Sequence, residues 1–310
     1  MRATPRRLPL GLAMLALVAS CDGSREAPPS DSVVTDPMLP PDTAALPSVS
    51  TSAWLRTAGP VLVLPGGGPG DAVIVFPELT DTTISDTVRF APGRTEGLVL
   101  DLFDRAGRVT PDTVARMPPH EWTEGCIDWP SAALRGAPLN WTMGFAAGRV
   151  TVIPLDSIEG MSSQDSASLA ATLARLGSTG LDSGEARFRG LPFRVRSAYR
   201  FQLADSTIVV VADLVRLLTV EANPRQEHTL LIAERSAGGG ELRVVHHDRR
   251  AGPEETLEAV ELLGAVRLGA DAHPALVLAH LGYETTAYAL LERLAPGTWR
   301  RRWRSVTTGC

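Results

Sequence analysis

Few residue types in this chain can take part in acid–base, nucleophilic or metal chemistry. All 30 basic residues are arginines, and the sequence contains no lysine. A Schiff-base lysine, a P-loop lysine over a phosphate and a serine–lysine nucleophile pair are therefore excluded. The remaining candidates are six histidines, three cysteines and small groups of acidic, aromatic and glycine residues.

The histidines follow no metal-ligand pattern. No His-Glu-x-x-His motif is present, and the adjacent His246 and His247 would point to opposite faces of a strand. His246 and Asp248 would share a face, which supplies two ligands at best. We therefore predict no metal site and no cofactor, and we interpret all six as solvent-facing or hydrogen-bonded: His120, His228, His246, His247, His273 and His280.

Two further motifs have possible catalytic interpretations. The run Gly66-Gly67-Gly68-Pro69-Gly70 resembles the glycine-rich oxyanion loop of α/β-hydrolases, but no Gly-x-Ser-x-Gly elbow follows it. A hairpin turn explains the glycines more simply. The acidic residues at positions 254, 255, 258 and 261 could form a paired-carboxylate site. We interpret them instead as a solvated face beside a turn, and assign no catalytic residue.

The N-terminus carries a targeting signal. Arg2, Arg6 and Arg7 precede an apolar stretch that is too short to span a bilayer as a mature helix. The following Val18-Ala19-Ser20-Cys21 resembles the lipobox of bacterial lipoproteins. By that resemblance, residues 1–20 are a signal peptide and Cys21 carries the lipid anchor. The implied location is the bacterial cell envelope, facing the periplasm or exposed at the surface, and we assign no leaflet.

The other two cysteines form an even pair. In an oxidising envelope, Cys126 and Cys310 favour a disulfide that would fasten the end of the chain to its first half. The position of Cys310 at the extreme C-terminus, where chains fray, argues against it. No basic partner lies near either residue in the sequence, so neither is predicted to be a nucleophile.

Trp299 and Trp303 are four residues apart and are flanked by arginines. On a regular strand both indoles would face one side. This pattern predicts either a surface that stacks on a carbohydrate or binds a partner, or a strand with buried tryptophans and a cationic outer row. We prefer the second interpretation.

Composition divides the chain into a tether and a folded body. Residues 21–52 are rich in Pro, Ser, Asp and Thr and cannot bury enough apolar surface to fold, which predicts a disordered tether. The whole chain is 44% hydrophobic and 21% charged, which indicates a folded body. Loss of the signal peptide changes the formal charge from −5 to −8. Nucleic acid is therefore not a predicted partner.

The body is predicted to be mainly β, with antiparallel sheets. We divide it into an N-terminal β-rich half, 53–180, and a C-terminal half, 181–310. The first half contains a hairpin around residues 61–76 and one amphipathic helix over 163–176, where Ser162 and Asp165 form a capping-box-like start, Leu169, Leu173 and Leu176 form one stripe, and Gly177 ends the helix. The second half contains two sets of four strands, 193–202, 207–219, 228–235 and 241–247, then 256–268, 275–281, 285–294 and 298–305.

The two sets suggest propeller-like blades. The stretch from Gly269 to Leu278 resembles an FG-GAP/VCBS-type propeller repeat, whose turn binds calcium through several oxygen ligands. Only Asp271 remains among those ligand positions, so the resemblance implies a strand layout without the ion.

No constellation of catalytic residues emerges from the sequence. We therefore predict an envelope lipoprotein that is anchored in the membrane by its lipid and acts as a non-enzymatic binding or scaffold module for a protein or glycan partner. The alternative is an envelope hydrolase whose acidic and histidine residues converge only in the folded chain. A histidine and a carboxylate in one pocket would favour that alternative.

Overall fold

The computed structural model describes residues 62–76, 96–118, 128–136, 138–180, 186–218, 224–268 and 273–309. All of them belong to one compact unit of the chain. The predicted signal peptide and tether lie outside the described residues, as do Cys21, His120, Cys126 and Cys310. Lipidation and the disulfide therefore stay predictions.

The first strands close a small antiparallel barrel in the order β1-β2-β5-β4-β3-β6. The predicted hairpin is confirmed, because Leu62 pairs with Val75 and the Gly66 N–H donates to the Asp71 carbonyl across the turn (2.9 Å). Inward-pointing apolar side chains such as Phe145 fill the barrel. Its strands are β1 (Leu62–Pro65), β2 (Asp71–Val75), β3 (Val99–Phe103), β4 (Val109–Arg116), β5 (Ser131–Leu134) and β6 (Met143–Ala146).

Two antiparallel sheets follow the barrel. The helix-side sheet has the order β12-β11-β10-β9-β8. Its strands are β8 (Asp156–Ser157), β9 (Arg194–Gln202), β10 (Ile208–Leu218), β11 (Arg225–Arg235) and β12 (Arg243–Pro253). The barrel-side sheet has the order β16-β15-β14-β13-β7, with β17 beside β15. Its strands are β7 (Thr151–Ile153), β13 (Ala259–Arg267), β14 (Pro274–Leu281), β15 (Thr285–Ala295), β16 (Thr298–Arg304) and β17 (Thr308–Gly309).

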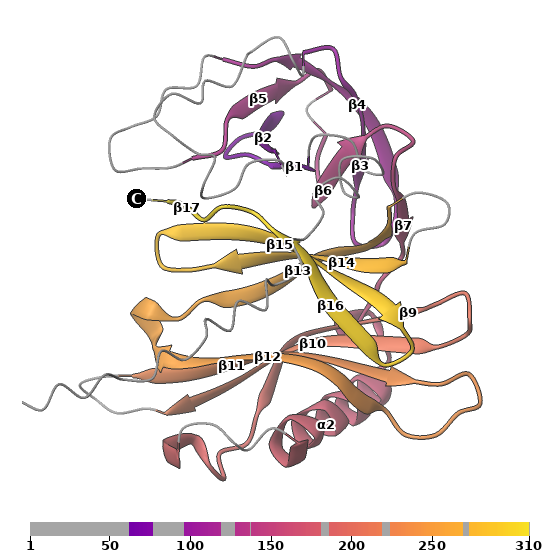
Figure 1. Ribbon diagram of the computed structural model, residues 1–310, viewed down its shortest axis with the longest axis vertical. Coiled ribbons are helices and arrows are strands. Elements are labelled where there is room, and N and C mark those ends of the chain that lie inside the picture. The colour runs from indigo at the N-terminus through magenta and orange to yellow at the C-terminus, as the bar shows by residue number, and fades with distance from the viewer. Residues whose placement is uncertain are drawn as a thin grey trace, which may run out of the picture. The chain divides into compact units, whose positions relative to one another are not determined.

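Three hydrophobic clusters arrange these parts in layers (Figure 1). The first fills the barrel and includes Val277 and Leu290 of the barrel-side sheet. The second lies between the two sheets, where Ile232 of β11 and Leu278 of β14 pack in one cluster. The third lies between the helix-side sheet and the helix α2 (Ser163–Gly180). The order of layers is therefore barrel, barrel-side sheet, helix-side sheet and helix.

The predicted fold class is confirmed: the chain is mainly β, with antiparallel sheets and one α-helix among the described residues. Both predicted sets of four strands are present, as β9–β12 and β13–β16. The two sheets pack face to face through one shared cluster, and propeller-like blades are not confirmed. The chain passes from the barrel into the sheets at β7 and β8, within the first predicted half.

The helix begins as predicted and ends later. The Ser162 hydroxyl accepts from the Asp165 N–H (3.2 Å) and donates to the Asp165 carboxylate (2.7 Å), which agrees with the predicted capping-box-like start. Leu173 is fully buried on the predicted stripe. Gly177, however, does not end the helix: a Cβ there would lie 2.7 Å from Leu214 Cδ1, so the glycine allows close packing on the helix-side sheet.

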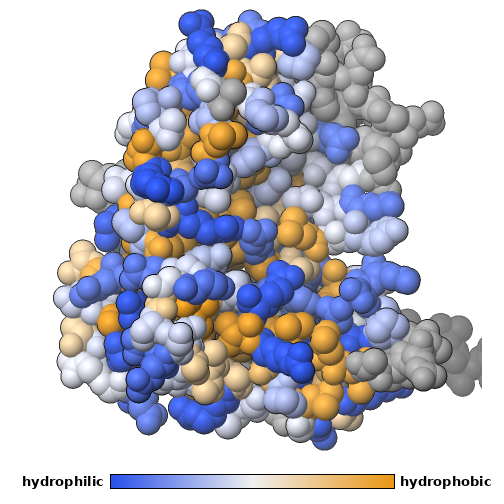
Figure 2. All heavy atoms as spheres, turned by 180° about the vertical axis from the view of Figure 1, so that it is seen from behind, coloured by the Kyte–Doolittle hydropathy of each residue, from blue (hydrophilic) through white to orange (hydrophobic). Residues whose placement is uncertain are grey.

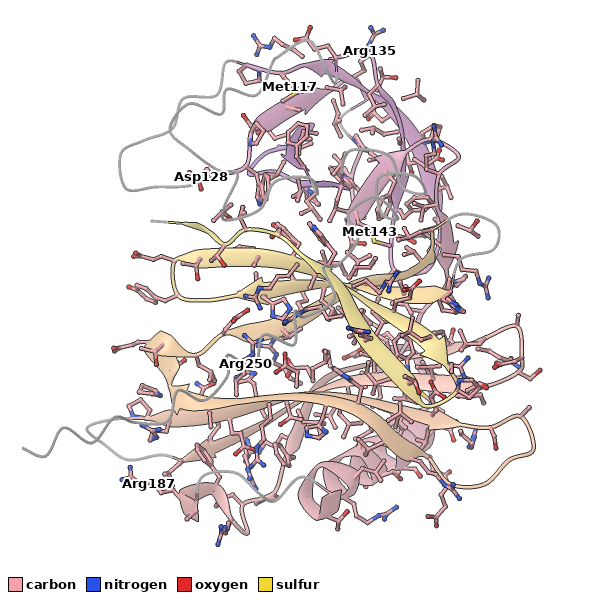
Figure 3. The ribbon with its side chains drawn as sticks, viewed as in Figure 1. Met117, Asp128, Arg135, Met143, Arg187 and Arg250 are labelled. Carbon is pink, nitrogen blue, oxygen red and sulfur yellow. The ribbon has the colours of Figure 1, made fainter. Side chains whose placement is uncertain are left out.

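The barrel is joined to the open edge of β13. Arg105, between β3 and β4, donates through Nε to the Leu262 carbonyl (3.1 Å) and pairs with the Glu261 carboxylate. Met143 of β6 packs over Gly264, whose missing Cβ would overlap with the Met143 methyl group (Figure 3). The Arg105 bond satisfies the Leu262 carbonyl, which lies outside the part of β13, residues 265–267, that the short β7 pairs.

Candidate functional site

A groove with a volume of about 910 Å³ lies between α2 and the helix-side sheet. Its floor is apolar and includes Leu169 of the helix, Ile208 and Val210 of β10, and Leu242 after β11. The helix α2 packs on the sheet through Leu173 and the residues after it. The groove lies between the first turns of α2 and the end of the β10–β11 hairpin. We call it the helix groove.

Positively and negatively charged side chains line the rim of the helix groove. Arg200 of β9 pairs with Asp156 of β8 (3.3 Å), and Asp165 accepts the capping hydrogen bond from Ser162. Arg175 of α2 and Arg235 at the end of β11 make no ion pair with the residues that the structure describes. Among the described residues, Glu241 on the rim likewise makes no ion pair, so the rim presents groups of both charges that a ligand can meet.

A second site lies between the two sheets, where their shared interior changes from apolar to charged. Asp248 and Arg250 of β12 are the cross-strand partners of Leu230 and His228. Because side chains alternate along a strand, both lie on the face of the sheet that meets the barrel-side sheet. His280 of β14 faces them, because it follows the buried Leu278 by two residues. Figure 3 shows Arg250 in the space between the sheets.

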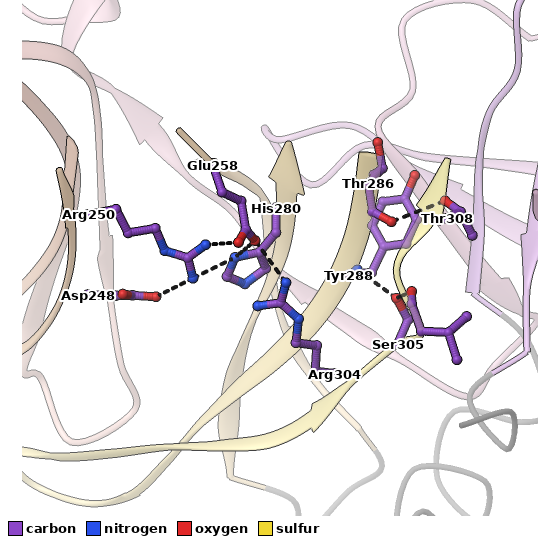
Figure 4. A network of polar contacts seen from close by, with 10 residues as sticks. Asp248, Arg250, Glu258, His280, Thr286, Tyr288, Arg304, Ser305 and Thr308 are labelled. Carbon is purple, nitrogen blue, oxygen red and sulfur yellow. Dashed lines mark hydrogen bonds and ion pairs between the residues drawn. The ribbon is translucent and has the colours of Figure 1, made fainter. Parts of the chain in front are cut away.

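These groups form one connected ion cluster (Figure 4). The Glu258 carboxylate accepts from the Arg304 guanidinium (2.9 Å), pairs with Arg250 and lies 2.8 Å from His280 Nδ1. Arg250 also donates to Asp248 (3.0 Å). Two carboxylates thus balance two guanidiniums around one imidazole. We call these five residues the intersheet cluster.

The imidazole of the intersheet cluster is neutral at pH 7. Burial and the neighbouring Arg304 lower the pKa of His280 to about 4, against the opposing effect of Glu258. His280 Nδ1 lies 2.8 Å from a Glu258 carboxylate oxygen and 3.3 Å from Arg250 Nη2. His280, Glu258 and Arg304 also line a pocket of about 430 Å³ that includes Thr285.

The two tryptophans do not share a face, so that prediction is wrong. The β15–β16 register shifts between Leu290 and Leu291, and Arg302 is the extra residue of a β-bulge. The bulge reverses the alternation, so Trp299 packs between the sheets and Trp303 packs in the cluster shared with the barrel. Their exposed fractions are 7% and 3%, which agrees with the interpretation as buried tryptophans.

The acidic group divides into two kinds of residue. Glu254 and Glu255 are exposed in the short 3-10 helix η4 (Glu254–Thr256), as a solvated face requires. Glu261 is 44% exposed and pairs with Arg105 at the surface, whereas Glu258 is half-buried in the intersheet cluster, so the prediction of a solvated face is wrong for Glu258. The predicted strand alternation of His246 and Asp248 is confirmed by their register on β12.

His280 cannot be recognised as a site residue from its neighbours in the sequence. Its partners Arg250 and Glu258 come from different strands or loops, and no local spacing connects them. The only sequence signal for its burial is the alternation along β14, which places His280 on the same face as Leu276 and Leu278. A histidine on that apolar face is predicted to be buried and therefore to have a hydrogen-bond partner.

The space-filling view from behind shows apolar patches interrupted by charged side chains, without one large apolar face (Figure 2). In the described part of the chain, no helix is long and apolar enough to cross a membrane. Within the same ranges, no group of three or more potential metal ligands is found. Comparison with protein-family models, with curated proteins and with solved structures found no match to this chain.

Proposed function

We propose that this chain is a lipid-anchored module of the bacterial envelope that binds a partner in the helix groove without catalysing a reaction. The observation that carries this proposal is the groove itself, whose volume of about 910 Å³ is at the upper end of the range for ligand sites. An apolar floor supplies affinity, and a rim of both charges supplies orientation.

Site-specific photo-cross-linking in living cells tests this function. A photoreactive amino acid at Ser168 or Thr172, which line the groove, is expected to give a discrete adduct. The same amino acid at Leu139 or Val109, which are exposed elsewhere (73% and 53%), is expected to give none. A Cys21→Ser variant is expected to lose both membrane fractionation and the adduct.

A matched pair of substitutions provides the control. Leu242→Glu places a charge on the groove floor and is expected to abolish the adduct, whereas Leu217→Glu changes a half-exposed leucine of β10 outside the groove. Equal adducts in both variants, or adducts at all four positions, would contradict binding in the helix groove.

A hydrolase is the second candidate, and the intersheet cluster is the observation that favours it. Neutral His280 would take a proton from water, and Arg304 would stabilise an oxyanion. Two features oppose it. A pKa of about 4 makes a weak base at pH 7, and Glu258 is already neutralised by two arginines.

Hydrolysis of a panel of chromogenic esters, amides and glycosides by the purified chain decides between the candidates. If the cluster is catalytic, His280→Gln lowers kcat/KM by about 100-fold or more, whereas His273→Gln, which changes an exposed histidine, has no effect. We expect no turnover above buffer in any of the three proteins, in agreement with a binding module.

A further inference from the structure

We propose that the pocket beside the intersheet cluster binds a neutral saccharide. This pocket, which we call the hairpin pocket, has a volume of about 430 Å³ and is lined by residues of η4, of the turn that joins β14 to β15 and of the intersheet cluster. It shares no lining residue with the helix groove, so this inference goes beyond the proposed function and does not depend on it. Three properties of the hairpin pocket support it: unpartnered polar groups on its walls, the balance of its charges and an aromatic side chain at its lip.

The base of the hairpin pocket contains a buried nitrogen without a partner. His280 is 3% exposed, lines the pocket and uses Nδ1 for its contacts to Glu258 and Arg250 (Figure 4). Its other ring nitrogen, Nε2, makes no hydrogen bond with any described residue. Depending on the tautomer, Nε2 either donates or accepts, and a hydroxyl group can do both. A hydroxyl of the ligand therefore satisfies this buried nitrogen in either tautomer.

Other groups on the walls match a ligand that is rich in hydroxyls. Arg304 donates through Nη2 to Glu258 and makes no other hydrogen bond with the described residues, so its remaining N–H groups can donate to a ligand. The hydroxyls of Thr285 and Thr307, two exposed residues that line the pocket, also have no hydrogen-bond partner within the described ranges. A saccharide presents several hydroxyls side by side, and each of them both donates and accepts.

The charges of the hairpin pocket disfavour an anion. At the base, the Arg304 guanidinium is paired with Glu258. The other two carboxylates of the pocket, those of Glu255 and Glu284, are exposed and make no ion pair with the described residues. An anionic ligand would therefore meet negative charge that no free arginine of the pocket balances. An organic cation would pair with these carboxylates, but it would lie beside the positive charge of Arg304 and leave its N–H groups unpartnered.

An aromatic side chain lies at the lip of the hairpin pocket. Tyr283, in the turn between β14 and β15, is 76% exposed and is the only exposed aromatic residue in the described part of the chain. The C–H groups on one face of a sugar ring are apolar and can pack on an aromatic ring, while the hydroxyls bind polar groups. Ala287 is the only aliphatic residue among the described lining residues, so an acyl chain would find no apolar wall.

Saturation-transfer-difference NMR on the purified chain tests this inference. The probes are glucose, galactose, mannose and N-acetylglucosamine, together with the uronate and the protonated amino sugar of the same rings. We expect a neutral sugar to bind more tightly than its charged relatives. Tyr283→Ala is expected to lower the affinity about tenfold, whereas Tyr283→Phe keeps the ring and is expected to bind like the parent chain. The matched control Leu139→Ala changes a side chain of similar exposure (73%) outside the pocket and is expected to have no effect.

A second variant tests the walls of the hairpin pocket. Thr285→Val/Thr307→Val replaces two hydroxyls by methyl groups of similar size and is expected to weaken binding of the neutral sugar. Equal affinity in this variant and in Tyr283→Ala would place the sugar elsewhere and overturn the inference. Absence of transfer to every neutral sugar would also overturn it, as would transfer to the protonated amino sugars alone, which identifies an organic cation as the ligand. Leu242→Glu on the floor of the helix groove is expected to keep the sugar signal, so failure here leaves the proposed function intact.

Discussion

Replacement of Glu234 by alanine is expected to lower the free energy of unfolding by about 3–5 kcal/mol, because it leaves a buried guanidinium without its main counter-ion. Glu234 of β11 and Arg293 of β15 are 8% and 7% exposed and join the two sheets through two hydrogen bonds of 2.8 and 3.1 Å. The same carboxylate accepts from Trp299 Nε1 (2.8 Å) and from the Gly297 N–H (3.0 Å). One side chain thus satisfies donors from three parts of the barrel-side sheet.

The pKa of Glu234 agrees with this role. Burial by itself would raise the pKa of the carboxyl group, but the hydrogen bonds from Arg293, Trp299 and Gly297 outweigh burial and lower it. The folded state therefore favours the ionised carboxylate. Its contribution to stability is present above the ordinary carboxyl pKa and is lost as the pH falls through the lowered value.

Urea denaturation at pH 7, monitored by circular dichroism, measures the loss of free energy of unfolding in the Glu234→Ala variant. Glu261→Gln is the control, since Glu261 is 44% exposed and its ion pair with Arg105 is expected to contribute less than about 1 kcal/mol. The double variant Glu234→Gln/Arg293→Met removes both charges and is expected to recover part of the loss. A loss below about 1 kcal/mol for Glu234→Ala would show that water or Asp205 satisfies Arg293 instead.

Stability is expected to fall as the pH is lowered from about 6.5 to 4, mainly because of His280. Its pKa of about 4 lies below the ordinary histidine value of 6.5. Between these values the unfolded chain binds a proton that the folded chain does not, so acid favours unfolding. The slope is at most about 1.4 kcal/mol per pH unit for one such histidine. Burial and the neighbouring His247 also lower the pKa of His246, which adds to the effect in the same direction.

Unfolding midpoints at half-unit steps between pH 4 and 7 provide the measurement. His280→Gln is expected to flatten the profile, and His246→Gln/His280→Gln to flatten it further. His273→Gln, at an exposed position, is expected to keep the parent slope. Carboxylates with lowered pKa values, such as Glu234 and Asp248, begin to lose their contributions only near the ordinary carboxyl pKa at the acid end of this range, so the slope above about pH 5 reports the histidines. An unchanged slope in His280→Gln would contradict the buried neutral imidazole.

Local chemistry made much of this chain predictable from its sequence. The capping box at Ser162, the leucine stripe and the two sets of strands depend on neighbouring residues and on periodicity, and all of them are found in the structure. The end of the helix was missed because Gly177 is held by packing on Leu214, which is a tertiary contact. The β-bulge at Arg302 also cannot be predicted from the pattern of residues, and it places the two tryptophans in different hydrophobic clusters.

The candidate site was decided by tertiary structure alone. The sequence by itself determined that lysine chemistry is excluded, that the body is mainly β and that no catalytic motif is present in consecutive residues. It could not place Glu258, His280 and Arg304 together, or set α2 over β10 to form a groove, since those contacts depend on how two sheets and a helix stack. Periodicity reports which face of an element is apolar, but only packing decides what that face meets.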